Sequence, residues 1–169
     1  MANMIILAAR NPTLTFFILG LLFSLAEWLS QSRPMEKAKI IESIFSWFLL
    51  FNIGLAFVYN FIMHVFFGDF TAQFIGWPQS PFQMELGFVS LGIAVNGIIS
   101  FRSKMAFRVA TIIVPAIFLW GAAGVHLFQM FTAHNFEPGN AGTVFWTDIL
   151  MPALAFLLLW LQYRNPLIR

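Results

Sequence analysis

A chain of 169 residues is long enough for one domain, but its composition excludes an ordinary soluble one, because 60% of the residues are hydrophobic and only 9% are charged. Soluble domains carry about 25% charged residues, so lipid rather than water is expected to surround most of this surface. The basic residues behind the net charge of +2 lie between apolar runs, which excludes a nucleic-acid-binding patch. The absence of Cys excludes disulfides, thiolate metal ligands and cysteine nucleophiles.

Five stretches are long and apolar enough to cross the membrane as helices, each needing about 20 residues. A helix satisfies its own backbone hydrogen bonds in lipid, so the predicted fold class is an all-α integral membrane bundle. Residues 1–169 are expected to form a single transmembrane domain. In chain order, the predicted spans are residues 12–30, 43–67, 81–101, 107–131 and 144–163.

The basic residues indicate how the spans are oriented. With five spans, all Lys and Arg residues except Arg10 fall on one side of the membrane. Because cytoplasmic loops are enriched in Lys and Arg, the sequence predicts a cytoplasmic C-terminus and an N-terminus outside. The residues on the predicted inner side are Arg33, Lys37, Lys39, Arg102, Lys104, Arg108, Arg164 and Arg169.

The segment before the third span contains a helix-start pattern. Ser80 and Gln83 have the spacing of a capping box, in which each side chain satisfies a backbone donor, and Pro81 suits the first helical position. Trp77 is expected to anchor this end at the membrane interface. A functional alternative centres on Glu85, one turn further in, where a carboxylate is costly unless it is paired, protonated or hydrated.

This segment also carries a resemblance. Its Gly-Trp-Pro-x-Ser-Pro-Phe-Gln-x-Glu pattern resembles one from an uncharacterised family of small bacterial integral membrane proteins, and the length and span pattern extend the resemblance over most of the chain. The resemblance implies a multi-pass protein of the bacterial inner (plasma) membrane, and it implies no activity, cofactor or partner. The residues that carry it are Gly76, Trp77, Pro78, Ser80, Pro81, Phe82, Gln83 and Glu85.

Ionisable residues from four spans lie at a similar depth near the predicted outer face. From the rise of 1.5 Å per residue, each lies roughly 5–8 Å below the interface. Depth agreement alone does not establish contact, so their convergence is a hypothesis. The candidate ligand- or ion-binding residues are His64, Glu85, His126 and Asp148, with Asn60 and Asn96 beneath them.

Polar residues in the second and third spans also repeat at helical spacing. Such stripes are expected to face the bundle interior, because polar side chains are costly against lipid. The second span carries Asn52, Asn60 and His64, and the third carries Glu85, Gly92, Asn96 and Ser100.

Three interpretations of these polar residues remain open. They form a buried hydrogen-bond network that fixes the helices, or they line a path for a ligand or ion, or they hold a cofactor. For the cofactor, two histidines and a carboxylate suit a divalent metal, and two histidines on facing helices suit haem. The candidate metal ligands are His64, His126 and Glu85, and no helix carries a paired ligand motif that selects either group.

The preferred function is non-enzymatic: an outward-facing polar cavity that binds or conducts a small ligand or ion. The enzymatic alternative is a membrane oxidoreductase in which His64 and His126 hold haem or a metal. A third alternative is a structural or accessory subunit, with the chain forming a homo-oligomer or joining a larger membrane complex. The expected surroundings are the lipid bilayer, and no nucleic-acid partner is expected.

Overall fold

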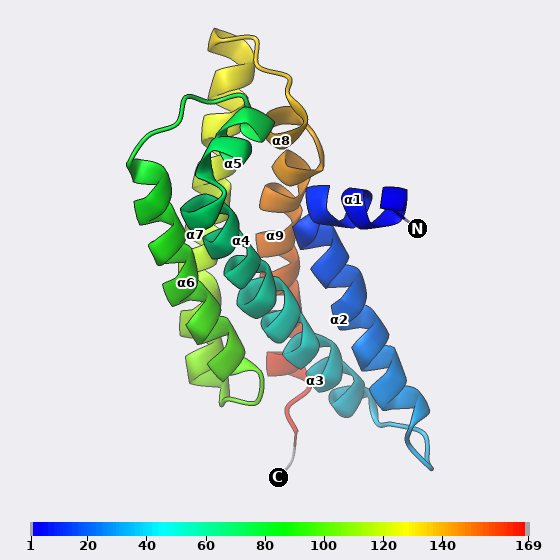
Figure 1. The fold of residues 1–169 in the computed structure, drawn as a ribbon. Coiled ribbons are helices and arrows are strands. Elements are labelled where there is room, and N and C mark those ends of the chain that lie inside the picture. Colours follow the sequence, from blue (N-terminus) through cyan, green and yellow to red (C-terminus); the bar gives the residue numbers. More distant parts are fainter. Residues whose placement is uncertain (1, 168–169) are drawn as a thin grey trace.

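A computed structural model describes residues 2–167, and this part of the chain is helical without a β-strand. Its helices form an elongated bundle (Figure 1). In chain order they are α1 (Ala2–Arg10), α2 (Pro12–Leu29), α3 (Lys37–Phe48), the π-helix η1 (Leu49–Leu55), α4 (Ala56–Phe66), α5 (Gly68–Ile75), α6 (Phe82–Ser100), α7 (Met105–Thr132), α8 (Pro138–Ala141) and α9 (Thr143–Arg164).

Five helices in the described residues are long and apolar enough to cross a membrane, as the sequence predicted. They are α2, the continuous α3–η1–α4 rod, α6, α7 and the α8–α9 segment. The second span begins at Lys37 rather than at residue 43. The sequence prediction began the span after the last charged residue of this segment, Glu42. In the structure, Glu42 is part of the helix and is paired with Arg108.

The two ends of the bundle differ in their basic residues, as the sequence suggested. The loop between α2 and α3, the loop between α6 and α7 and the end of α9 lie at one end, and α5 and α8 lie at the other (Figure 1). The predicted inner basic residues that the structure describes therefore share one end, and Arg169 lies outside the described residues. The direction in which the bundle crosses the membrane stays a prediction.

The α3–η1–α4 rod is the central helix. Of the residues in its apolar stretch, 67% are buried, against 11% for α2. Most residues of α2 are therefore not buried. Phe45 and Leu49 of the rod are completely buried. At Gly97 of α6, a Cβ atom would lie 2.4 Å from the backbone nitrogen of Gly54, so the two helices approach at backbone contact.

This close approach fixes which face of α6 points inward. The buried face carries small residues, and the polar stripe predicted to face the interior is largely wrong for this helix. Glu85, Gly92 and Asn96 are exposed, and only Ser100 of that stripe is buried. Helical spacing alone cannot distinguish a polar stripe from a small-residue stripe, and here backbone contact favours the latter. The inward-facing small residues are Gly87, Ser90, Ala94 and Gly97.

Candidate functional site

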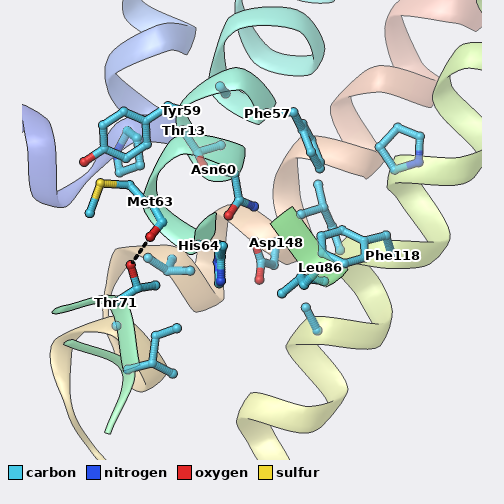
Figure 2. A pocket seen from close by; sticks show the side chains of 18 of the residues that line it. Thr13, Phe57, Tyr59, Asn60, Met63, His64, Thr71, Leu86, Phe118 and Asp148 are labelled. Atoms are coloured by element: carbon cyan, nitrogen blue, oxygen red, sulfur yellow. Dashed lines mark hydrogen bonds between the residues drawn. The ribbon is translucent and has the colours of Figure 1, made fainter. Parts of the chain in front are cut away.

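A cavity of about 750 Å³ lies within the bundle, lined mainly by η1, α4, α5, α7 and α9, with residues of α1, α2, α6 and α8 (Figure 2). Its volume lies in the range of small-molecule sites, about 300–1,000 Å³. The walls are mainly apolar and rich in aromatic rings, which include Phe57, Phe74, Trp77 and Phe118. Of the predicted site residues, the cavity lining includes Asn60, His64, His126 and Asp148.

Figure 2 shows Asn60 and His64 of α4 and Asp148 of α9 gathered in one part of the cavity. Asn60 and His64 are one helical turn apart and therefore lie on the same face of α4. The Nδ1 atom of His64 is buried and has no hydrogen-bond partner in the described part of the chain. This group of polar residues thus lies among mainly apolar walls, and one of its buried nitrogen atoms lacks a hydrogen-bond partner.

Deeper in the bundle, Asn52 of the π-helix also lines the cavity. Its amide nitrogen donates to the Thr13 carbonyl at 3.1 Å, which orients the amide group. The Oδ1 atom is left buried and without a partner among the described residues. Buried acceptors of this kind are uncommon and require an explanation, such as a bound water or ligand. π-Helical turns are frequent at functional sites, and this one carries the unpaired amide.

Asn140 of α8 connects the residues at one end of the cavity, Trp77, His126 and Gly139, which we call the roof. It is completely buried, and its amide nitrogen donates to the backbone carbonyls of His126 (3.2 Å) and Asn135 (2.9 Å). Its Oδ1 atom accepts from the indole nitrogen of Trp77 at 3.1 Å and lies 2.8 Å from Nδ1 of His126. All hydrogen-bonding positions of the Asn140 amide group are therefore used.

These contacts determine where His126 carries a proton. The Asn140 oxygen can only accept, so Nδ1 of His126 must donate to it. The other ring nitrogen, Nε2, lies 3.7 Å from Oδ2 of Asp148, which is beyond direct hydrogen-bond range. His126 and Asp148 are both buried, so the pair brings a carboxyl group and an imidazole together at the cavity wall.

The roof is further fixed by Gly76 and Asn135. Gly76 ends α5 in the left-handed region, with φ of 76°, where glycine has no steric penalty. Asn135 donates to the Ile75 carbonyl at 2.9 Å and to the Gly76 carbonyl at 3.2 Å. Trp77, predicted as an interface anchor, follows Gly76 directly and donates a hydrogen bond to Asn140. Its ring centroid lies 5.3 Å from that of His126.

The structure places Glu85 and Asn96 outside the cavity. Both are exposed on α6, and neither contributes to the cavity lining. The predicted capping box is also wrong, because no side chain caps this helix, whose N-cap is Pro81. Gln83 instead donates to the Gly68 carbonyl at 3.0 Å, which ties α6 to the start of α5.

A second, smaller pocket of about 480 Å³ lies next to the first, at the end that carries α5. Its lining includes Asp69 and Gln79, and it shares His64 and Ser80 with the main cavity. His64 therefore lies between this second pocket and the main cavity.

A further polar cluster, which sequence reasoning missed, lies at the opposite end of the bundle. Arg108 of α7 is 1% exposed and makes a bidentate ion pair with Glu42 of α3, with both N–O distances 2.8 Å. Arg108 also donates to the Ser100 and Phe101 carbonyls at the end of α6, and Gln162 of α9 donates to Glu42. The cluster joins four spanning segments, which indicates a structural role.

The family-model comparison matches residues 10–167 to a family described as "Family of unknown function (DUF6790)". The chain belongs to this family. The match spans both the cavity and the Arg108 cluster, and the family's description assigns no activity that could be transferred. Neither curated proteins nor solved structures yield a match.

Because the description of the family names no cofactor, the cofactor hypothesis depends on the geometry of the residues. Among the described residues, no group of three or more His, Asp or Glu side chains is placed to hold a metal ion. Glu85 is exposed on α6, away from His64 and His126. For haem, the Nδ1 atom of His126 is already engaged with Asn140, and Nε2 faces Asp148. The metal and haem alternatives therefore stay hypotheses.

Proposed function

We propose that this chain is a multi-pass membrane protein that binds a small, largely apolar molecule in the bundle cavity. One observation carries the proposal: a cavity with mainly apolar walls contains buried polar atoms that lack partners within the described residues, namely Asn52 Oδ1 and His64 Nδ1. A ligand or an accompanying water would satisfy such groups. Asn60, His64, His126 and Asp148 would orient the molecule, in keeping with the few polar groups of typical ligand sites.

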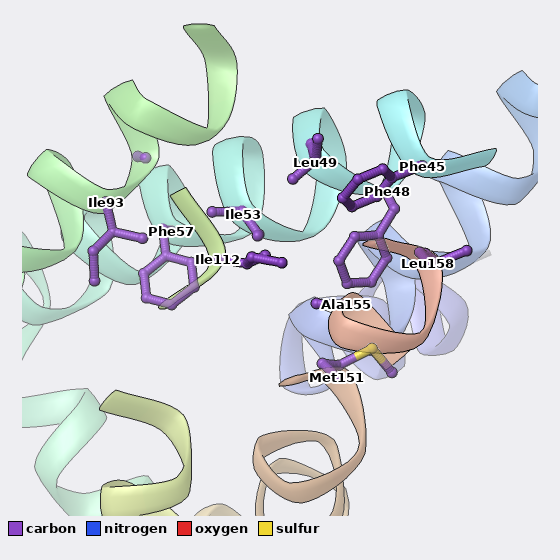
Figure 3. Packing of buried hydrophobic residues seen from close by; sticks show 11 residues of the cluster. Phe45, Phe48, Leu49, Ile53, Phe57, Ile93, Ile112, Met151, Ala155 and Leu158 are labelled. Carbon is purple, nitrogen blue, oxygen red and sulfur yellow. The ribbon is translucent and has the colours of Figure 1, made fainter. Parts of the chain in front are cut away.

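The geometry favours binding over conduction. The inner end of the cavity is formed by Phe48, Ile53 and Ala155, which belong to the buried apolar core. Beyond them, Phe45 and Leu49 fill the space toward the Arg108 cluster (Figure 3). An ion would have to leave its hydration shell to cross this layer.

The alternative that the polar residues form a hydrogen-bond network that fixes the helices accounts for part of the molecule. Asn140 and Arg108 use their hydrogen-bonding capacity within the protein, as a network that fixes helices would. The unpaired atoms of Asn52 and His64 do not fit that explanation. We further propose, from the basic-residue asymmetry, that the cavity lies in the outer half of the membrane; that this is a bacterial inner membrane is what the family resemblance implies.

Filling the cavity should abolish ligand binding. Ala122 lines the cavity on α7, and a phenylalanine there would occupy ligand space. We expect native mass spectrometry to detect one molecule of a neutral apolar probe, triphenylphosphine oxide, bound per wild-type chain, with the Ala122→Phe variant losing it. Ala110→Phe, at an exposed position on the same helix, is the matched control and should bind like wild type. Equal binding to all three proteins would place the probe outside the cavity.

A further inference from the structure

We infer that the cavity takes a lipophilic organic cation, with the Asp148 carboxylate as its counter-ion. The inference rests on the proposed ligand-binding function and names the class of ligand. Among the described residues that line the cavity, Asp148 is the one acidic side chain. It is 5% exposed, so it is nine-tenths buried within a spanning segment.

Asp148 has no hydrogen-bond partner in the part of the chain that the structure describes. Its Oδ2 atom lies 3.7 Å from Nε2 of His126, and His64 lies in the same part of the cavity (Figure 2). Because Nδ1 of His126 donates to Asn140, a neutral imidazole would point the lone pair of Nε2 toward the carboxylate. A carboxylate in a membrane interior is costly unless a proton or a cation compensates it. A ligand cation would provide that compensation inside the cavity.

The cavity walls suit the rest of such a molecule. The rings of Phe57, Phe74, Trp77 and Phe118 all contribute to the lining. Aromatic faces attract cations through their quadrupoles, most strongly where water is excluded, and they also pack against an apolar body. Quaternary ammonium groups are recognised by such rings together with few hydrogen bonds.

The polar groups nearby are compatible with a cation. Asn52 supplies a buried oxygen acceptor without a partner among the described residues. Arg10 is the one other charged residue in the lining that the structure describes, and it is exposed at the end of α1. A lone, hydrated arginine at the rim repels a cation weakly, because exposed charges are screened. A small metal cation is less suited, because no group of three ligand side chains surrounds the position in the described residues.

Two tetraphenyl ions of the same shape and opposite charge, with a smaller neutral phosphine oxide, separate charge from apolar character. They are tetraphenylphosphonium (cation), triphenylphosphine oxide (neutral) and tetraphenylborate (anion), titrated against detergent-purified full-length protein by native mass spectrometry. We expect wild type to bind the cation at least about tenfold more tightly than the neutral or anionic probe.

The Asp148→Asn variant keeps the shape of the side chain and removes its charge. We expect its affinity for the cation to fall by at least about tenfold, while its affinity for the neutral probe stays within about threefold and reports an intact cavity. The matched control is Asp69→Asn, because Asp69 is exposed and lines the second pocket. This variant should bind the cation like wild type.

The outcomes separate the two proposals. If the neutral or anionic probe binds wild type as well as the cation, or Asp148→Asn keeps the cation affinity, the cation class is overturned while cavity binding stands. If no probe binds wild type, the proposed function fails with it.

Discussion

Replacing Arg108 with methionine should lower the free energy of unfolding by about 3 kcal/mol, because it leaves the partly buried Glu42 carboxylate without its partner. The substitution also removes the donors to the Ser100 and Phe101 carbonyls at the end of α6. The measurement is an SDS titration in mixed micelles, followed by far-UV circular dichroism.

A double-mutant cycle separates the ion pair from the volume of the side chain. We expect the Arg108→Met/Glu42→Gln double variant to lose less stability than the sum of the two single variants, because it leaves no unpaired charge. Arg102→Met is the matched control, since Arg102 is exposed at the same end, and it should change stability by no more than about 0.5 kcal/mol. Strictly additive losses would argue against a coupled pair.

Replacing Asn140 with leucine should destabilise the protein by about 3 kcal/mol, because it leaves the buried His126 ring N–H without a partner and removes three further hydrogen bonds. Those bonds join Asn140 to the part-buried Trp77 indole N–H and to the backbone carbonyls of His126 and Asn135. The same SDS titration measures the loss. Because the roof of the cavity would lose its connection to α7, we also expect weaker binding of triphenylphosphine oxide.

The control for Asn140 is Asn96→Leu, at an exposed position on α6. It exchanges the same residue types where no buried partner is lost, and its effect on stability should stay within about 0.5 kcal/mol. If Asn140→Leu were equally mild, the hydrogen bonds around Asn140 would not be what stabilises the roof.

The sequence predicted the five spanning helices because lipid imposes a length and an apolar composition that can be read directly. It also named four residues that the structure brings to one cavity, Asn60, His64, His126 and Asp148. Depth in the membrane was the useful signal for three of them, although Glu85 shares that depth and lies outside the cavity.

What the sequence could not supply is the rotation of each helix about its axis. Glu85 and Asn96 fit an inward stripe by spacing, yet the contact between Gly97 and Gly54 turns α6 the other way. The pairing of Arg108 with Glu42 joins residues far apart in the chain, and Arg108 resembled an ordinary cytoplasmic-side charge. Asn140 lay in a predicted loop, where no local pattern separates a buried amide from a solvated one.

The most direct test of the proposed binding cavity uses single cysteines, because the chain contains none of its own. A cysteine replacing Asn60 should react with a small, membrane-permeant maleimide, and saturating triphenylphosphine oxide should slow that reaction by at least about tenfold, corresponding to near-full occupancy of the site. A cysteine replacing Asn96, on the exposed face of α6, should react at the same rate with and without the probe. Protection at residue 60 alone is the result that the proposed cavity predicts; equal reaction rates at residue 60 with and without the probe would contradict it.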